Sequence, residues 1–594
     1  MDSLVFMHEP AREYVYPSGR NSLVLKIKCT KKSRNAWEVV YWDRFFEDKV
    51  NRAALKHLTR DNDFDCFICE ITQEKPVRYL KYYFAASGDN GTAYFGPYGQ
   101  SESPPVHYYE YSYTNECDVF SVPEWAQGAV AYQIFPERFC NGDNSNDPRE
   151  TLQWDAKPTR TNFFGGDLKG IIDKLDHISS LGAGILYLNP IFKSPSNHKY
   201  DTQNYYDIDP SFGTIEDLKV LTAQCHKRNI RVILDGVFNH CGYMFEPFQD
   251  VLKNGGLSEY KDWFYIDEFP VVTDPPNYEC VGYYKWMPKI RLSGRRARDY
   301  FLDVGVYWIK EADIDGWRLD VSDEADFTFW QEFRRAVKSA KQDALLIGET
   351  WKDGRDLLRG DQMDSVMNYL FRNAAAEFFA LGEIDAFELD SRTHKMLSVY
   401  PVTVYPVLYN LIGSHDTERF LTLCKGDKKK LKLAAAFQMT FPGMPAIYYG
   451  DETGMDGDND PDCRRTMNWD NADNEMLGFY RKITALRNAE PCLKKGDFST
   501  VLCDGGCYAY ARRLGEETVY VAFNNSGVES NIDLPLFERS DCKLKSLLHE
   551  STYTAADIAD ACKFYNRDVN EYRSEFRLVL PAHQLDIIKS WRNE

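Results

Sequence analysis

The feature that most restricts the fold of this chain is an alternation of short apolar runs with longer helical stretches across residues 129–490. Eight short segments here are rich in apolar and β-branched residues, as buried strands are. Stretches with helical periodicity separate several of them, at residues 167–182, 214–229, 297–312 and 429–439. Because strands alternating with helices predict βα units, eight such units predict an α/β fold, a (β/α)8 TIM barrel.

The regions on both sides of the barrel segment have a different pattern. Residues 1–122 hold short runs of β-branched and aromatic residues separated by turn sequences, which predicts an N-terminal β-sandwich. Residues 491–594 return to short strand-like runs and predict a C-terminal β-sandwich. The barrel domain is therefore expected at 123–490. Its longest insertion, at about 241–293, contains aromatic and Pro-rich stretches that are expected to line a cleft.

Charge and cysteine content restrict the function. The net charge is −19 without any block of Lys and Arg, so a nucleic-acid partner is not expected, whereas a neutral substrate is compatible. No stretch reaches 18 consecutive apolar residues, so no membrane association is expected. The start of the sequence lacks the pattern of a signal peptide, and the 15 cysteines form no disulfide framework. These features predict a cytoplasmic protein with reduced thiols.

Acidic residues follow three of the predicted strands directly. Asp320 ends the run GWRLD, Glu349 follows ALLIG, and Asp416 follows LIGSH. In a barrel, the C-terminal ends of all strands meet at the pole where active sites lie. Arg318 and Asp320 are two residues apart on a strand and share a face, and a neighbouring guanidinium lowers the pKa of a carboxylate. Three carboxylates at one pole, one of them protonated, are the groups that cleave glycosidic bonds.

A solvated acidic loop is the alternative explanation for any one of these residues, since the chain contains 90 Asp and Glu. The ordered set favours a site. With DGVFNH at 235–240, the stretches GWRLDV, GET and SHD resemble, in order and spacing, the four motif regions of glycoside hydrolase family 13, the α-amylase family. MPKI at 287–290 and NDPDCRRTM at 459–467 are similar to the neopullulanase, cyclomaltodextrinase and maltogenic amylase branch. At 321–324 the chain has VSDE where VANE is typical, a departure beside subsites that tune substrate preference.

The resemblance implies a role for each matching residue. Asp320 would be the nucleophile, Glu349 the general acid and base, and Asp416 the third carboxylate of a retaining hydrolase. Glu349 is expected to keep its proton because the neighbouring carboxylates disfavour its ionisation. Asp235 would support the site. The residues that the resemblance assigns to substrate binding are Tyr200, His240, Arg318, His415, Asp460 and Arg464.

The resemblance also extends to a metal. An Asx-rich loop at 141–147, followed by GGD at 165–167, supplies oxygen atoms of the kind that calcium binds. The alternative is a turn whose side chains satisfy their own backbone. Similarity to the calcium loop of the branch favours a structural Ca²⁺. The predicted ligands are Asn141, Asp143, Asn146, Asp147, Gly165 and Asp167.

The leading hypothesis is a retaining α-glucan hydrolase that cleaves α-1,4 bonds of cyclodextrins, maltooligosaccharides and pullulan, with some transglycosylation. One alternative is an α-glucosidase or glucan transferase acting on short α-linked sugars. Another is a catalytically inactive carbohydrate-binding scaffold, which the presence of all three acids disfavours. Because the N-terminal domain of the branch commonly takes part in dimers, the resemblance further implies a homodimer through residues 1–122.

Overall fold

The computed structural model describes residues 5–30, 36–88, 91–558 and 572–591. These residues form two compact units. The first unit combines residues 1–122 with 355–361 and 388–405, and the second contains the remainder of the chain. No helix in the described part of the chain is long and apolar enough to cross a membrane.

The first unit is built from two antiparallel sheets around one aromatic core. One sheet has the order β1-β3-β7-β6, with β2 beside β3, and the other has the order β10-β9-β8-β4-β5, with β11 beside β8. Leu25, Trp37 and Phe84 are each at most 2% exposed between the sheets. The predicted N-terminal β-sandwich is confirmed. The long strands are β3 (Ser22–Thr30), β4 (Ala36–Asp43), β7 (Phe64–Thr72) and β8 (Arg78–Gly88). The shorter ones are β1 (Phe6–Met7), β2 (Val15–Gly19), β5 (Asn51–Ala54), β6 (Lys56–Arg60), β9 (Gly91–Gly96), β10 (Gly99–Ser101) and β11 (Tyr109–Tyr113).

A helix from the middle of the chain completes this unit. Most of α8 (Ala386–Val399) clusters with the N-terminal sandwich. Lys26 is fully buried and donates from Nζ to the carbonyl of Ser398 at 2.8 Å. Thr59 and His394 form a second buried hydrogen bond between the sheet and α8. The sequence pattern, which placed residues 386–399 within the barrel region, gave no sign of this association.

The second unit contains a closed parallel barrel, which confirms the predicted (β/α)8 fold. Its eight strands pair in the order β19-β18-β17-β16-β13-β12-β21-β20, and a parallel bridge between Met367 and Tyr409 joins the two edges. Nearly every strand residue is buried, as expected for strands covered by helices on one face and packed together on the other. The strands are β12 (Ala131–Ile134), β13 (Ile185–Leu188), β16 (Arg231–Gly236), β17 (Gly316–Leu319), β18 (Leu345–Gly348), β19 (Ser365–Val366), β20 (Tyr409–Leu411) and β21 (Met444–Tyr448).

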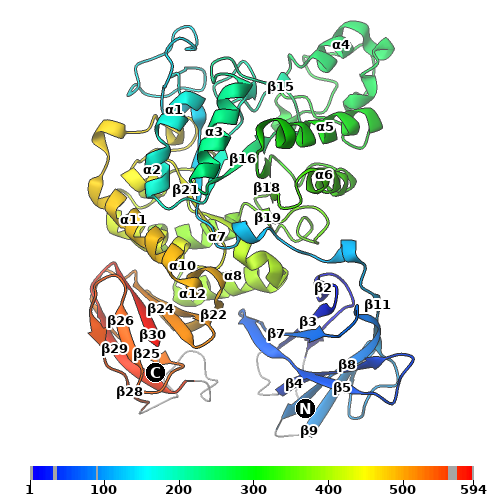
Figure 1. Ribbon diagram of the computed structural model, residues 1–594, viewed down its shortest axis with the longest axis vertical. Coiled ribbons are helices and arrows are strands. Elements are labelled where there is room, and N and C mark those ends of the chain that lie inside the picture. Colours follow the sequence, from blue (N-terminus) through cyan, green and yellow to red (C-terminus); the bar gives the residue numbers. More distant parts are fainter. Residues whose placement is uncertain (1–4, 31–35, 89–90, 559–571, 592–594) are drawn as a thin grey trace. The chain divides into compact units, whose positions relative to one another are not determined.

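Helices surround these strands (Figure 1). They include α3 (Ile215–Lys227), α5 (Arg295–Ala312), α6 (Phe327–Ala340), α10 (Lys428–Thr440) and α11 (Asn474–Ala489). Helix α3 begins with a capping box between Thr214 and Asp217. Helices α5 and α6 pack so closely that a Cβ at Gly305 would lie 2.3 Å from the ring of Phe333. A glycine is therefore required at that contact.

The helix predicted at 167–182 is instead two short helices, α1 (Leu168–Asp173) and α2 (Leu175–Ser180). The chain leaves helical geometry at Lys174, with φ −106° and ψ 9°. At this break the ammonium group of Lys174 lies 4.3 Å from the ring centre of Trp469. Periodicity along the sequence contains no information about such a distant contact.

The insertion after β16 consists of α4 (Glu246–Asn254) and irregular chain with short 3-10 turns. Phe248 and Trp263 form part of its interior, whereas Tyr283, Tyr284 and Trp286 are more than half exposed.

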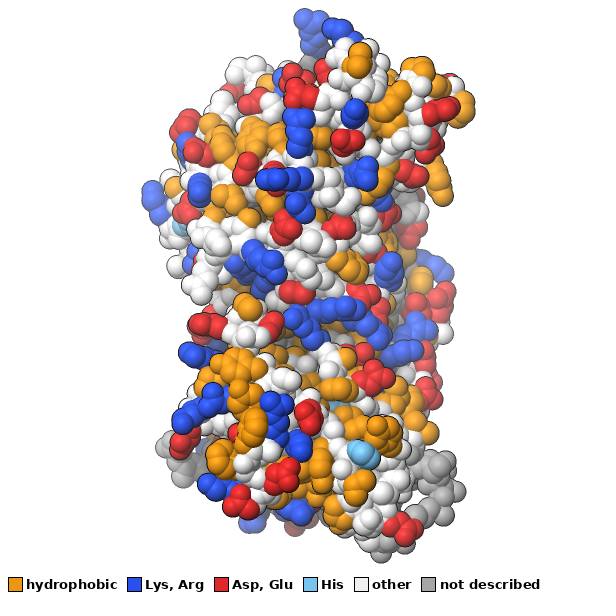
Figure 2. Space-filling view, turned by 90° about the vertical axis from the view of Figure 1, so that its right-hand side faces the viewer, with side chains coloured by type: hydrophobic (Ala, Val, Ile, Leu, Met, Phe, Trp, Pro, Cys, Tyr) orange, Lys and Arg blue, Asp and Glu red, His pale blue; other side chains and the backbone are white. Residues whose placement is uncertain are grey.

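On the face shown in Figure 2, Lys and Arg side chains are interspersed with Asp, Glu and apolar side chains. That face therefore has no uniform basic surface of the kind that binds nucleic acid.

The C-terminal domain belongs to the same unit as the barrel. It has a six-stranded antiparallel sheet, β22-β23-β24-β30-β26-β27, and a three-stranded sheet, β25-β29-β28. Buried Arg512 in β23 (Cys507–Leu514) donates to the carbonyl of Thr440 at the end of α10, at 2.6 Å. The predicted C-terminal β-domain is confirmed. Its other strands are β22 (Asp497–Asp504), β24 (Glu517–Asn524), β25 (Ser530–Leu536), β26 (Lys543–Ser546), β27 (Thr552–Tyr553), β28 (Ala556–Asp557), β29 (Ser574–Leu580) and β30 (Gln584–Trp591).

Candidate active site

One guanidinium group joins three carboxylates at the C-terminal ends of β16, β17 and β18. Arg318 donates from Nη1 to Oδ1 of Asp235 at 2.8 Å and to Oδ1 of Asp320 at 2.7 Å. Its Nη2 lies 3.0 Å from Oε2 of Glu349. All four side chains are nearly inaccessible to solvent. The strands are parallel and paired in register, so the acidic residues that follow them meet at one edge.

This cluster has more negative than positive charge, so it holds a proton more readily than isolated carboxyl groups do. Burial raises the pKa of Asp320 well above its ordinary range; Arg318 opposes this change, and the charges of Glu349 and Asp235 add to it. Burial also raises the pKa of Asp235. The expectation that Arg318 leaves Asp320 with a lowered pKa is therefore wrong, because the loss of solvent outweighs the guanidinium.

The two oxygens of Glu349 have different surroundings. Oε2 accepts a hydrogen bond from the backbone N–H of Val321 at 2.9 Å and lies beside Arg318, so it is the oxygen that holds negative charge. Among the described residues, Oε1 accepts a hydrogen bond from the indole Nε1 of Trp351, at 3.2 Å. The Trp351 ring is fixed by stacking on Tyr369, with ring centres 3.9 Å apart. Oε1 is consequently the oxygen of Glu349 with fewer protein contacts.

Val321 adopts a strained backbone conformation to make this contact. Its φ is +45°, a value that is rare for a β-branched residue. Such a conformation costs about 1–3 kcal/mol and persists only where the surrounding structure enforces it. Here it turns the N–H group toward Glu349 directly after Asp320.

His415 is held in one tautomer by residues from distant strands. Burial lowers its pKa well below the ordinary value, so the ring is neutral. Its Nδ1 accepts from Nε2 of Gln133 at 2.9 Å and lies 3.2 Å from Nδ2 of Asn189, which leaves the proton on Nε2. That nitrogen faces Oδ2 of Asp416 at 3.0 Å and the hydroxyl of Tyr200 at 2.5 Å.

Tyr200 connects this histidine to the carboxylate cluster. Its ring stacks on His415 with an interplanar angle of 3°, and its hydroxyl donates to Oδ2 of Asp235 at 2.9 Å. Tyr187 donates to the same oxygen at 2.6 Å. Arg318 donates to the other oxygen of Asp235, so both oxygens of this carboxylate bind neighbouring side chains and hold them in place.

Asp416 is the most accessible of the three predicted catalytic acids, with 27% of its side chain exposed. Nη2 of Arg464 lies 3.2 Å from its Oδ1, and Nη1 of Arg464 lies 3.0 Å from Oδ1 of Asp460. Nε of Arg464 donates to the carbonyl of His415 at 2.7 Å, which fixes the guanidinium. A polar face thus extends outward from Asp416 toward Asp460.

Two buried side chains beside the cluster are without partners. Both ring nitrogens of His240 and both amide atoms of Asn239 lack hydrogen bonds within the described residues. Nδ1 of His240 lies 4.0 Å from Oδ2 of Asp320, and burial lowers the pKa of His240 to about 4. Because buried polar groups are normally paired, these atoms are available for hydroxyl groups of a ligand.

All nine residues predicted for catalysis and substrate binding therefore lie in one connected set of contacts. Comparison with known proteins identifies the family of the chain. The family model for the alpha-amylase catalytic domain matches residues 133–482, and the model for the alpha-amylase N-terminal Ig-like domain matches residues 1–115. The chain belongs to the α-amylase family.

Relatives of this α-amylase family member match over most of its length. A cyclomaltodextrinase of Thermoanaerobacter pseudethanolicus is 44% identical over 91% of this chain and 95% of its own. Neopullulanase 2 of Thermoactinomyces vulgaris is 44% identical over 89% of this chain and 92% of its own. A solved cyclomaltodextrinase structure aligns with a TM-score of 0.90 and 38% identity, covering 98% of this chain and 99% of its own.

Sequence reasoning missed several residues of this α-amylase family site. The backbone N–H of Val321 and the indole of Trp351 donate to Glu349, and the amide of Asn239 is buried without a partner in the described residues, yet none has a predicted role. Two of these residues could have been found from their positions in the sequence. Trp351 lies two residues beyond Glu349, and Asn239 lies within the DGVFNH motif. The contact of Val321 has no sequence signal, because a strained backbone angle depends on tertiary structure.

The six residues predicted to bind calcium lie in the loop between β12 and α1. The side-chain Oδ1 atoms of Asn141 and Asn146 are buried and have no hydrogen-bond partner within the described residues. A Cβ at Gly165 would lie 2.2 Å from Oδ1 of Asp147, so these groups form a compact cradle. Unpaired amide oxygens of this kind fit a hard cation such as Ca²⁺.

The carboxylate of Asp167 is already hydrogen-bonded within the protein. It caps α1 and also organises the loop. It accepts four hydrogen bonds, from the backbone of Gly142, Asp143 and Gly170 and from the side chain of Asn146. All of its lone pairs are therefore used within the protein. The described residues contain no group of three or more His, Cys, Asp or Glu that is able to hold a metal ion, so a cation here would need amide and carbonyl oxygens in addition to carboxylates.

Proposed function

We propose that this α-amylase family member is a retaining α-glucan hydrolase that opens cyclodextrins and cleaves α-1,4 bonds in maltooligosaccharides and pullulan. The observation that carries the proposal is the contact of Arg318 with both Asp320 and Glu349. Retaining glycosidases place two carboxyl groups about 5–5.5 Å apart, whereas inverting enzymes leave about 6.5–9.5 Å for a water molecule. A single guanidinium that bridges both groups supports the shorter spacing. Relatives named cyclomaltodextrinase and neopullulanase support the substrate class.

In the first step Glu349 acts as the acid and Asp320 as the nucleophile. Oε1 of Glu349 transfers its proton to the glycosidic oxygen while Oδ2 of Asp320 forms a bond to the anomeric carbon. Arg318 binds Oδ1 of Asp320, so Oδ2 is the oxygen free to attack. The bond between the anomeric carbon and the leaving oxygen breaks, and a covalent β-glycosyl ester forms.

In the second step Glu349, now ionised, removes a proton from water. The water oxygen attacks the anomeric carbon and displaces Asp320, so two inversions return the α-configuration. An acceptor sugar hydroxyl in place of water gives transglycosylation by the same path. The N–H groups of Val321 and Trp351 stabilise the carboxylate form of Glu349 between the two steps.

The remaining residues bind and orient the sugar. Asp416 accepts hydroxyl groups of the reacting ring, and His415 and His240 donate to them from positions set by their burial. Tyr200 presents a ring face to the apolar face of the sugar. Arg464 and Asp460 bind the outer end of the bound glucose. In this scheme Asp235 acts through Arg318 and Tyr200, which it positions.

We further propose a structural Ca²⁺ in the loop after β12. Asn141, Asn146 and Asp147 would supply side-chain oxygens, with Asp143 and the Gly165 carbonyl as further ligands. Asp167 would hold the loop in shape. When bound, the cation would neutralise carboxylate charge and join the two ends of the loop. Its effect is expected on stability, since the loop is separate from the catalytic carboxylates.

A homodimer through the N-terminal domain and a cytoplasmic location complete the proposal. Phe45, Phe46 and Tyr98 on the N-terminal domain are 63%, 56% and 84% exposed, which is unusual for isolated aromatic residues and suits an interface. Light scattering of the wild type and of Phe46→Asp tests the dimer: the wild type is expected at twice the chain mass. Cysteines of the described residues such as Cys66, Cys69 and Cys225 are free thiols, which supports a reducing compartment.

Initial rates on β-cyclodextrin, pullulan and soluble starch, measured side by side, test the catalytic proposal. Faster opening of β-cyclodextrin than of starch is expected, and Asp320→Asn should abolish all three activities. Faster hydrolysis of short α-glucosides than of β-cyclodextrin, pullulan and starch would favour an α-glucosidase instead. No turnover of any α-linked substrate by a folded wild type would reject the hydrolase.

A further inference from the structure

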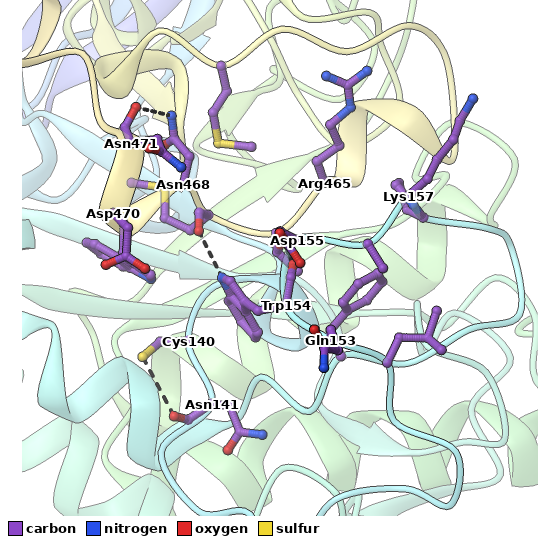
Figure 3. A pocket seen from close by; sticks show the side chains of 18 of the residues that line it. Cys140, Asn141, Gln153, Trp154, Asp155, Lys157, Arg465, Asn468, Asp470 and Asn471 are labelled. Carbon is purple, nitrogen blue, oxygen red and sulfur yellow. Dashed lines mark hydrogen bonds between the residues drawn. The ribbon is translucent and has the colours of Figure 1, made fainter.

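A second groove lies next to the active site and contains none of the predicted catalytic or substrate-binding residues. It has a volume of about 1260 Å³ and is formed by chain segments at 140–158 and 454–471 (Figure 3). Binding sites for small molecules usually measure about 300–1,000 Å³, so this groove has room for an extended ligand. The two segments follow β12 and β21, and the groove therefore opens at the pole of the barrel where the carboxylates lie.

Adjacent arginines separate the groove from the active site. Arg464 points to Asp416, whereas Arg465 lines the groove and pairs with Asp456 and Asp462. Buried Arg138 lies against the same segment and donates to the carbonyl of Arg464 at 2.8 Å. The segment that holds the substrate-binding arginine is thus also a wall of the groove. A ligand in the groove and a ligand at the carboxylates would be bound by opposite sides of one loop.

The floor of the groove is a fixed tryptophan. Trp154 lies at the centre of the lining side chains in Figure 3 and is half-buried. Nε1 of Trp154 donates to the carbonyl of Met467 at 2.9 Å, and the hydroxyl of Thr466 donates to the backbone carbonyl of Trp154. Within the part of the chain that the structure describes, no other aromatic ring packs against Trp154. Its ring is therefore oriented by hydrogen bonds from below and remains open for stacking.

The rim carries amide and charged side chains, and the lining carboxylates of Asp147, Asp155, Asp456 and Asp470 outnumber the cations of Lys157 and Arg465. Gln153 and Asn471 present amides, and Asp155 and Lys157 bring charges of opposite sign (Figure 3). The amide of Asn468 also lines the groove but is already bonded to Thr453 and to the carbonyl of Asn471. The charge of Arg465 is already neutralised by its aspartate partners. An aromatic platform bordered by amide and carboxylate groups fits a neutral polyhydroxylated ligand. It does not fit an anion, because no unpaired cluster of positive charge lines the groove.

We propose that this groove binds a second segment of α-glucan, with Trp154 stacking on a glucose ring and the rim amides bonding to its hydroxyls. The inference rests on the proposed function for the identity of the sugar, and it adds a site outside the catalytic cleft. A linear glucan held there has its remaining chain at a high effective concentration near the carboxylates. The groove thereby favours linear oligosaccharides over small rings, which cannot span both sites.

Hydrogen exchange measured by mass spectrometry tests the proposal on the full-length chain. Maltoheptaose and β-cyclodextrin are added to the Asp320→Asn variant, in which neither is consumed. Maltoheptaose is expected to protect residues 151–158 and 465–471 as well as the segments of the catalytic cleft. In Trp154→Ala in the same background, the maltoheptaose concentration needed for half-maximal protection of residues 151–158 should rise about tenfold, equal to about 1.4 kcal/mol.

Two control variants make the result specific. Trp154→Phe keeps a ring and loses only the bond to Met467, so it should retain most of the protection. Trp286→Ala removes an exposed tryptophan of the insertion, outside the groove, and should leave protection of 151–158 intact. If maltoheptaose protects only the catalytic cleft while the wild type hydrolyses α-glucans, the groove proposal is overturned and the proposed function stands. If no segment is protected and no α-glucan is hydrolysed, both fail.

Discussion

Replacing Arg318 by methionine removes the one cation that the three carboxylates share and leaves a side chain of similar length. Removing one partner of a buried ion pair costs about 3–5 kcal/mol, because the remaining charge is left without compensation. We therefore expect Arg318→Met to lower the free energy of unfolding by about that amount at pH 7.5. The same loss of positive potential at Asp320 is expected to lower kcat on β-cyclodextrin by about 10²–10⁴-fold.

The stability deficit should depend on pH, and its sign follows from linkage. Burial already raises the pKa of Asp320 and Asp235 in the folded protein, and loss of Arg318 raises these values further. A folded state that binds more protons than the unfolded state loses stability as pH rises toward the raised pKa. The deficit of Arg318→Met should therefore be smaller at pH 5 than at pH 7.5, by about 1.4 kcal/mol for each pH unit by which the substitution raises a carboxyl pKa.

Arg487→Met is the matched control for this measurement. Arg487 is also fully buried, but its guanidinium donates to backbone carbonyls, among them those of Gly128 and Met439 at 2.9 and 2.6 Å. Its loss should reduce stability equally at pH 5 and pH 7.5. Urea unfolding followed by tryptophan fluorescence at both pH values gives the comparison. A deficit of Arg318→Met that is under about 1 kcal/mol, or that does not change with pH, would refute the shared-cation account.

Three further predictions concern individual contacts. Trp351→Phe keeps the stacking on Tyr369 and removes the donor to Glu349, so kcat should fall about tenfold with KM little changed, and an unchanged kcat would exclude a role for the indole N–H. Burial raises the pKa of Asp451, which accepts a hydrogen bond from Arg419, to about 7. The stability of the wild type relative to Asp451→Asn should therefore fall as pH rises from 4 to 7, by about 1.4 kcal/mol for each pH unit by which folding raises this pKa. Parallel pH profiles of the two proteins would contradict this. Calcium at a hundredfold excess over its dissociation constant should raise the free energy of unfolding by about 2.7 kcal/mol, and Asn141→Leu should abolish the gain; an equal gain in the variant would place the cation elsewhere.

Much of the fold was predictable because buried parallel strands have a strong local signature. Each of the eight apolar runs became a barrel strand, since continuous β-branched segments between helical stretches have few other stable arrangements. The position of the acids followed from the same reasoning: Asp320 and Glu349 directly follow β17 and β18, and strands in register bring their ends together. Local pattern and barrel topology were sufficient for these features.

The features that were missed all depend on tertiary contacts. Helix α8 joins the N-terminal sandwich through Lys26 and Thr59, which are more than 300 residues distant in the sequence. The tautomer of His415 is set by Gln133 and Asn189 from the opposite end of the barrel sequence. The pKa of Asp320 was predicted in the wrong direction because the sequence shows the neighbouring arginine and does not show the degree of burial.

Trapping of the glycosyl-enzyme tests the central claim most directly. A slow fluorinated α-glucosyl substrate is mixed with the wild type, and the labelled peptide is located by mass spectrometry. The account predicts one glucosyl group per chain, attached to Asp320, and an α-configured product on turnover; Asp320→Asn should remain unlabelled. A β-configured product, or a label on any residue other than Asp320, would contradict the double displacement proposed for this cluster.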